Sequence, residues 1–280
     1  MKKILALLPL LSILFTSCTL THKPDSSSQS EETSSSETTE EETYGESETS
    51  EESTETESET ESTDPNAKYY ESVDKSSGSQ MRKTLQQLMF NTHKTYPSYG
   101  DIRNLFVYSD ADPNKSGNII CFYSHESMSG KWDQGVTYNR EHVWPKAKSS
   151  GLYNSMDNGY KGPGSDLHHV RPTKTEVNEA RGSQSFGYYI PQADVRGDCA
   201  RIIMYMYVHY SSACNSGVTS NYIGDLTISS VFNSINTLKD WNEADPVDQL
   251  EKNRNEYVYK KQGNRNPFID HPEWVNLALA

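Results

Sequence analysis

Hydrophobic and polar positions divide the chain into three stretches of different character. An apolar run from Ile4 to Phe15 is followed by a polar stretch, 19–63, which consists almost wholly of Ser, Thr and Glu. Apolar residues return in quantity only in residues 64–280. Because so polar a segment cannot bury enough surface to offset chain entropy, we expect 19–63 to be a disordered tether. Residues 64–280 are enough for one domain with a good core.

Helical spacing of apolar residues predicts three long helices in this domain. Ser79–His93 carries its apolar residues on one face, and Gly197–Tyr210 has the composition of a buried helix. A third helix is expected to begin at Asp245 as its N-cap, with Pro246 in the first helical position, and to end before Gly263. The domain is therefore expected to be mostly helical.

Shorter strand-like segments lie between these helices. Their ranges are Asn118–Ser124, Tyr138–Pro145 and Ser165–Pro172, and a long loop rich in Gly and Ser separates the last two. A polar helix is expected to follow at Thr173–Arg181, with Thr173 as N-cap and Glu176 as the reciprocal acid of a capping box. A strand, a loop, a strand and a short helix inside a helical surround predict an α+β fold.

The start of the chain has the form of an export signal, because Lys2 and Lys3 precede the apolar run. That run is too short for a comfortable membrane span, which needs about 20 apolar residues. It ends in Phe15-Thr16-Ser17-Cys18, which resembles a bacterial lipoprotein box in which Cys18 is lipidated. We expect a lipoprotein-type signal at residues 1–18 and an exported protein, either anchored at the cell surface through Cys18 or, alternatively, fully secreted.

Charge is distributed unevenly between the tether and the domain. The whole chain has a formal net charge of −13, but residues 19–63 alone carry fifteen acidic residues and one lysine. The domain at 64–280 is therefore close to neutral. Overall acidity would argue against a nucleic-acid partner, whereas a neutral domain can still present a local basic surface. We expect the self-repelling tether to act as a spacer.

Three cysteines fall within the domain, at Cys121, Cys199 and Cys214. Cys199 lies near the start of a predicted helix whose far end is more than about 15 Å away, at about 1.5 Å rise per residue. A disulfide needs Cα atoms within about 7 Å, so a bridge between Cys199 and Cys214 is not expected. Free core thiols are the favoured interpretation, and pairing of Cys121 with one of the others is the alternative.

The candidate chemistry begins with Glu141 and His142, which are neighbours on a predicted strand. Adjacent strand residues point to opposite faces, so one side chain can hold a metal ion while the other acts on water beside it. An isolated pair of this kind is usually a surface charge cluster. Further polar residues near the ends of short elements favour a functional site here, and they are His168, His169, Arg171, Asn178 and Arg181.

Four motifs in order, NREHVWP, SDLHHVRPT, EVNEAR and GNRNPFIDHPEWV, resemble those of the bacterial endonuclease I family. Members of that family are secreted or periplasmic nonspecific nucleases of the ββα-metal (His-Me finger) fold. The resemblance runs from about Gln80 to Val275, nearly the whole domain. It implies a ββα-metal core embedded in a mostly helical single domain, and a monomer that takes DNA, RNA or both as substrate through the phosphate backbone.

The resemblance also implies roles for particular residues. His142 would be the general base that deprotonates the attacking water, and Glu141 and Asn178 would bind one divalent cation. Mg²⁺ is the expected ion, because hard oxygen ligands suit it and it keeps open positions for phosphate oxygens. Mn²⁺ and Ca²⁺ accept the same ligands and stay open as alternatives.

Four other residues of these motifs are candidates for supporting the site or for binding the phosphate. Strand alternation would send either His168 or His169 into the site, and the DLH motif of the family favours His168 as a supporting contact. Arg171 and Arg181 are candidates for neutralising the scissile phosphate, because guanidinium matches phosphate geometry. The alternative for Arg181 is an ion pair with Glu176 or a contact with the end of its own helix.

Two other classes of function stay open. One is a non-catalytic surface module that binds nucleic acid, and the other is a metal-dependent hydrolase of other phosphoesters. Glu141, His142 and Asn178 together favour the nuclease, since a binding module has no need of a base beside a metal site. Cleavage or mere binding of nucleic acid would separate these classes.

Overall fold

The computed structural model describes residues 64–153, 155–218 and 224–280. The expected signal, Cys18 and the acidic tether lie outside the described residues. Among the described helices, none is both long enough and apolar enough to cross a membrane.

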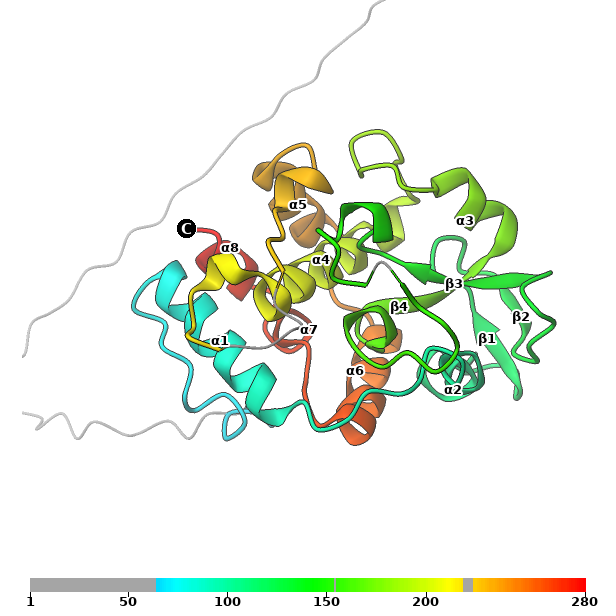
Figure 1. The fold of residues 1–280 in the computed structure, drawn as a ribbon, viewed down its shortest axis with the longest axis horizontal. Coiled ribbons are helices and arrows are strands. Elements are labelled where there is room, and N and C mark those ends of the chain that lie inside the picture. Colours follow the sequence, from blue (N-terminus) through cyan, green and yellow to red (C-terminus); the bar gives the residue numbers. More distant parts are fainter. Residues whose placement is uncertain (1–63, 154, 219–223) are drawn as a thin grey trace, which may run out of the picture. The chain divides into compact units, whose positions relative to one another are not determined.

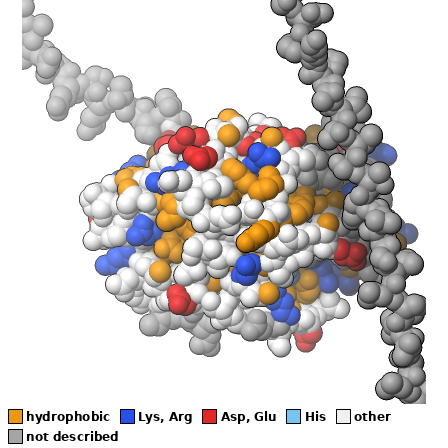
Figure 2. Space-filling model, turned by 90° about the horizontal axis from the view of Figure 1, so that it is seen from above, with side chains coloured by type: hydrophobic (Ala, Val, Ile, Leu, Met, Phe, Trp, Pro, Cys, Tyr) orange, Lys and Arg blue, Asp and Glu red, His pale blue; other side chains and the backbone are white. Residues whose placement is uncertain are grey.

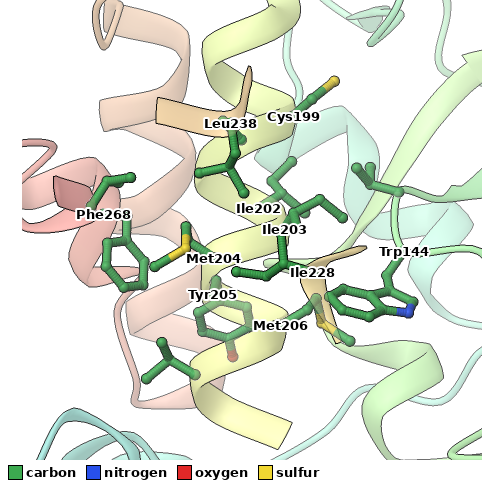
Figure 3. Packing of buried hydrophobic residues seen from close by; sticks show 14 of the residues in the cluster. Trp144, Cys199, Ile202, Ile203, Met204, Tyr205, Met206, Ile228, Leu238 and Phe268 are labelled. Carbon is green, nitrogen blue, oxygen red and sulfur yellow. The ribbon is translucent and has the colours of Figure 1, made fainter. Parts of the chain in front are cut away.

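Helix α4, Arg196–Tyr210, forms the centre of the fold, and nearly all of its residues are buried. Helices α1 (Gly78–Thr92) and α5 (Ile235–Ala244) pack against it, as does the short helix α7 (Pro267–Asp270). Figure 3 shows Phe268 on the side of Met204 and Trp144 on the side of Met206. The buried helix expected at 197–210 is thus confirmed. It packs against the other helices and also against Trp144, in the segment that follows the strand of His142.

The remaining helices are α2 (Ile102–Ser109), α3 (Thr175–Arg181), α6 (Gln249–Gln262) and α8 (Trp274–Ala278). Helix α6 begins later than expected, because the side chain of Asp248 accepts from Glu251 N and is the N-cap. Asp245 instead follows the last residue of α5. Gly263 ends α6 as predicted, with a φ of 90°, a conformation that glycine adopts without strain.

Two small antiparallel sheets carry the strands, at the right of Figure 1. Strand β1 (Asn118–Ile120) pairs with β2 (Ser127–Ser129), and β3 (Tyr138–His142) pairs with β4 (Val170–Lys174). In the second sheet Glu141 lies opposite Arg171, and His142 lies opposite Val170. Helix α3 follows β4 without a break, so β3, β4 and α3 form one compact unit. The expected α+β architecture is present.

The strand expected at Ser165–Pro172 begins only at Val170. A 3₁₀ turn at Pro163–Ser165 and a further turn precede it, because the backbone oxygen of Asp166 accepts from the backbone nitrogens of His169 and Val170. The prediction that strand alternation orients His168 and His169 is therefore wrong. Both residues lie in the turn before β4.

The expected cap of α3 is also wrong. Thr173 is buried within β4, opposite Asn139, and the N-cap position of α3 is Lys174, whose side chain makes no capping hydrogen bond. The first strand is shorter than expected for a similar reason. The chain turns back at Cys121, whose carbonyl oxygen accepts from His125 N, and leads into β2.

Candidate active site

His142 is the last residue of β3, and its ring lies between two tyrosine rings. The imidazole centroid lies 5.6 Å from that of Tyr99 and 5.3 Å from that of Tyr153, with interplanar angles of 27° and 20°. Its Nε2 atom lies 2.9 Å from the carbonyl oxygen of Gly164. Because a carbonyl oxygen only accepts, this contact requires the proton on Nε2 and leaves the basic lone pair on Nδ1.

The electrostatic surroundings keep His142 neutral. Burial lowers the pKa of His142 to about 3, and the nearby His169 acts in the same direction, whereas the carbonyl of Gly164 opposes the shift. The ring is therefore uncharged near pH 7. Neutral imidazole is the form that can take a proton from water. The negative charge of a bound phosphate would raise this low pKa toward the working pH, at which a general base is most effective.

Gly164 supports His142 from the 3₁₀ turn before β4. A Cβ atom at this position would lie 2.3 Å from Met156 Sδ and 2.8 Å from Tyr153 Cβ. A larger residue would displace the turn, and with it the carbonyl that fixes the tautomer of His142. Glycine is thus required here by close packing.

Glu141 faces a different set of residues from its neighbour. Its side chain is buried, and Oε1 accepts a hydrogen bond of 2.8 Å from the hydroxyl of Tyr123. Arg181 Nε lies 3.5 Å from the same oxygen. Burial raises the pKa of Glu141 to about 7, and Arg181 and Tyr123 limit the rise by favouring the carboxylate. A further positive charge at this position would complete its ionisation.

Asn178 lies on α3, the helix that continues directly from β4. It is half-buried, and none of the described residues forms a hydrogen bond with its side chain. The Glu141 carboxylate and the Asn178 amide oxygen are hard donors of the kind that Mg²⁺ accepts. A cation would have no hydrogen bond of Asn178 to displace, and it would supply the charge that buried Glu141 lacks. The chemistry of these two donors therefore suits a divalent cation.

Arg181 is fully buried behind Glu141. Its Nη2 donates to the carbonyl oxygen of Val143 at 2.8 Å, and its Nη1 donates to that of Gly182 at 3.1 Å. The expected alternative partner, Glu176, instead pairs with Lys174. The contacts of Arg181 place it as a support of Glu141 and of the segment after β3, and its contact with phosphate stays a prediction.

Arg171 lies opposite Glu141 in the sheet, yet its guanidinium is engaged elsewhere. Its Nε donates to Asp110 Oδ1 at 2.9 Å, and it lies over the ring of Phe122, 4.3 Å from the centroid. Arg254 Nε donates to the same oxygen at 3.0 Å. Two cations thus share the Asp110 carboxylate, and Arg171 also lines a surface pocket. Its role toward phosphate stays a prediction too.

The two adjacent histidines point in different directions. His169 lies beside His142, whereas the sequence favoured His168 for that position. The ring of His169 lies 5.3 Å from that of His142, and its Nε2 accepts from Trp144 N at 3.0 Å. His168 points away, with Nε2 2.9 Å from the carbonyl oxygen of Asn264. The expectation that His168 would be the supporting contact is corrected, because the turn sends His169 beside the base.

Asp166 fixes that turn from within the core. Its Oδ2 accepts from the hydroxyls of Tyr205 and Tyr210, both at 2.6 Å, and its Oδ1 accepts from Gln262 Nε2 at 2.8 Å and from His168 N at 2.9 Å. Because tyrosines of α4 and a glutamine of α6 hold one carboxylate, the histidine turn is anchored to two helices.

A cluster of possible metal ligands also includes Asp166. One nitrogen of His93, one of His209 and a carboxylate oxygen of Asp166 lie within 4.8 Å of one another. The four hydrogen bonds to the carboxylate use its acceptor sites, and His93 Nδ1 lies 3.1 Å from His209 Nε2. The cluster is therefore better explained as a buried hydrogen-bond network than as a metal centre.

Sequence reasoning missed the residues that orient the base and the acid. Tyr99, Tyr123 and Tyr153 each contact His142 or Glu141, and Gly164 sets the tautomer. The only signal for them in the sequence is the high tyrosine content, with 18 in the chain. Nothing local in the sequence distinguishes these tyrosines from the others.

Comparisons with known proteins show what the chain is similar to. The model of a protein family described as Endonuclease I matches residues 77–192 and 189–273. The extracellular ribonuclease of Bacillus subtilis (strain 168) is 37% identical over 231 residues, which are 74% of this chain and 77% of the relative. The extracellular ribonuclease of Bacillus amyloliquefaciens is 36% identical over 231 residues, with shares of 74% and 76%. The first family match contains every residue of the candidate site.

Proposed function

This chain belongs to the endonuclease I family and is a nuclease, and we propose that it hydrolyses phosphodiester bonds outside the cell with His142 as its general base. The observation that carries the proposal is the position of His142. A neutral imidazole, fixed by a backbone carbonyl, stands on the same strand as the buried carboxylate of Glu141. We further propose that β3, β4 and α3 are the core of a ββα-metal (His-Me finger) fold.

In the proposed reaction, His142 Nδ1 takes a proton from a water molecule. The water oxygen then forms a bond to phosphorus, and the bond from phosphorus to the 3′ oxygen breaks as the leaving oxygen gains a proton from solvent. Gly164 keeps the proton on Nε2 throughout, so Nδ1 stays the acceptor. Tyr99 and Tyr153 restrict rotation of the imidazole ring from its two sides.

Glu141 and Asn178 are the proposed ligands of a single divalent cation, and Mg²⁺ is the ion that we expect. Such an ion would stabilise the negative charge that develops on the phosphate and on the leaving oxygen. The chain's own contribution is to hold the carboxylate in place through Tyr123 and Arg181. Mn²⁺ or Ca²⁺ would suit the same oxygen ligands.

RNA is the substrate best supported, because both relatives are named ribonucleases. Cleavage of DNA is proposed as well, because DNA and RNA carry the same backbone phosphates and differ in the 2′-hydroxyl of the sugar. The word extracellular in the names of both relatives, together with the apolar start of this chain, supports export. Anchoring through a lipid on Cys18 and a monomeric state are part of the proposal.

The test is incubation of the purified chain with plasmid DNA and with RNA, in Mg²⁺ or in chelator, beside His142→Ala. Loss of a general base typically costs about 10²- to 10⁴-fold in rate, so we expect that loss in the variant and no cleavage in chelator. Cleavage that survives chelation, or that is undiminished in His142→Ala, would contradict the mechanism. Binding without cleavage by the unaltered chain would support a non-catalytic module instead.

A further inference from the structure

Five arginines of the described part have a carboxylate partner, and they are Arg171, Arg181, Arg201, Arg254 and Arg265. The other four, Arg82, Arg103, Arg140 and Arg196, form no ion pair with any described residue, although all are half-buried. Of these, Arg140 lies on the strand of the proposed base. A partly desolvated cation without a counter-ion is costly, and an anionic ligand removes that cost. The arginines with unmatched charge are therefore the first place to look for bound phosphates.

Arg140 stands beside the proposed base. It lies two residues before His142 on β3, so the two side chains leave the same face of the strand. Its guanidinium carbon lies 3.7 Å from the centroid of the Tyr99 ring. The same Tyr99 ring also contacts the imidazole of His142. Arg140 Nη1 also donates to the carbonyl oxygen of Tyr99. These contacts hold the guanidinium in place and leave its remaining N–H groups without a carboxylate.

A second cation and a second ring extend this arrangement. The Trp132 ring lies 5.4 Å from the guanidinium of Arg140 and 5.7 Å from that of Arg103, which lies on α2. All these side chains are partly exposed. Tyr99, Arg140, Trp132 and Arg103 are thus connected by successive contacts between cations and aromatic rings, and this group, here called the arginine–tryptophan strip, contacts His142 through Tyr99.

Other positive charges of the described residues offer no clear alternative for holding a phosphate backbone. On the face seen in Figure 2, lysine and arginine side chains are scattered among neutral and hydrophobic ones. On that face the described residues form no continuous basic surface that would hold a phosphate backbone by itself. Meanwhile Arg171 and Arg181, which the sequence favoured, are neutralised by Asp110 and Glu141.

We propose that the arginine–tryptophan strip binds an unpaired nucleic-acid strand next to the scissile phosphate, with Arg140 and Arg103 on neighbouring phosphates and Trp132 stacked on a base. This inference rests on the proposed function and names the substrate class of that site. Guanidinium matches phosphate geometry, and an aromatic ring stacks on a base of any sequence. In a duplex the bases are stacked on one another and closed to Trp132, so the strip favours single strands.

The experiment measures binding separately from cleavage. The purified chain and its variants are titrated, in chelator, into a fluorescently labelled single-stranded RNA and into a duplex of the same length, at several salt concentrations. Arg140→Gln and Arg103→Gln remove one phosphate contact each, so we expect each to reduce the slope of log affinity against log salt by about 0.7 on the single strand. Trp132→Ala removes stacking, and we expect it to weaken single-strand binding by about fivefold or more and to spare the duplex.

The matched control is Arg196→Gln. Arg196 also lacks an ion pair among the described residues and also lies over a tryptophan, 5.7 Å from the Trp241 ring, but it stands at the start of α4 outside the strip. We expect it to bind like the unaltered chain. Thermal melting of every variant identifies any that fails to fold. If Arg140→Gln fails to fold, Arg103→Gln on α2 still tests the inference.

Two results overturn the inference while leaving the proposed function intact. The first is unchanged single-strand affinity and salt slope in Arg140→Gln, Arg103→Gln and Trp132→Ala, in a chain whose cleavage still depends on His142. The second is an equal loss on single strand and duplex in Trp132→Ala. Failure of the proposed function is distinct, since it shows as absence of cleavage by the unaltered chain.

Discussion

The hydroxyl of Tyr123 donates a hydrogen bond of 2.8 Å to Glu141 Oε1, inside a region that solvent scarcely reaches. The tyrosine lies in the turn between β1 and β2, so a residue from one small sheet positions the acid of the other. Burial raises the pKa of Tyr123 well above its usual value, which keeps its hydroxyl a donor. The carboxylate therefore has a fixed orientation before any ion arrives.

Gly164→Ala should reduce turnover more than it reduces stability. The added Cβ collides with Met156 and Tyr153, and the displaced carbonyl would no longer hold the proton on Nε2 of His142. Loss of positioning of this kind costs up to about 10²-fold in rate. Steady-state cleavage of a fluorogenic RNA measures it. Gly159→Ala is the control, because a Cβ there comes no closer than 3.3 Å to Asp157 Oδ1, and normal turnover in Gly164→Ala would remove Gly164 from the mechanism.

Glu141→Gln should change how stability depends on pH in metal-free protein. The pKa of Glu141 is raised to about 7 from a usual value of 4.5, so between these values the folded state holds a proton that the unfolded state has lost. The contribution of Glu141 to the stability of the unaltered chain then falls as pH rises from 4.5 to 7, by up to about 3 kcal/mol. The variant lacks this contribution. Urea unfolding in chelator at pH 5 and pH 7.5 measures it, and an unchanged difference between the two proteins at both pH values would refute the assignment.

Mg²⁺ should raise the melting temperature of the unaltered chain and not that of Asn178→Ala. A ligand that binds only the folded state stabilises it by about 2.7 kcal/mol at one hundred times its dissociation constant. The side chain of Asn178 makes no hydrogen bond with a described residue, and alanine favours helices, so the variant should fold normally. Glu179→Ala, the exposed neighbour on α3, is the control and should keep the full response. An equal response in Asn178→Ala would mean that the ion binds elsewhere.

Arg181→Met should destabilise the domain and leave the salt dependence of RNA binding unchanged. The substitution leaves the carbonyl of Val143 and the carboxylate of Glu141 without their buried partner, and loss of one member of such a pair costs about 3–5 kcal/mol. A phosphate contact would instead reduce the slope of log affinity against log salt. Chemical unfolding and binding titrations at three salt concentrations distinguish the two roles.

The strand of His142, the helix of Asn178 and the buried helix α4 could all be predicted, because each depends on its own local pattern. The turn that carries His168 and His169 could not. Asp166 draws its hydrogen-bond partners from Tyr205, Tyr210 and Gln262, which lie 39, 44 and 96 residues away in the chain. Contacts at such separations leave no periodic trace in the sequence.

The site also contains residues that the sequence could predict and residues that it could not. Glu141, His142 and Asn178 come from motifs, and the structure brings β3 and α3 together as one unit, although the metal ion stays a proposal. The tyrosines that flank His142 come from loops whose sequences give no structural signal. Arg171 and Arg181 were selected for their chemistry, and only the structure shows that Asp110 and Glu141 already neutralise their charge.

The three cysteines of the described part are free and buried, which is the favoured interpretation of their odd number, and Cys121 pairs with neither of the others. Burial raises the pKa of Cys121 and of Cys214 to about 12, and that of Cys199 well above its usual value. The described fold therefore depends on no oxidant to form and offers little thiolate for one to attack. Oxidising and reducing surroundings should therefore leave the described fold equally intact.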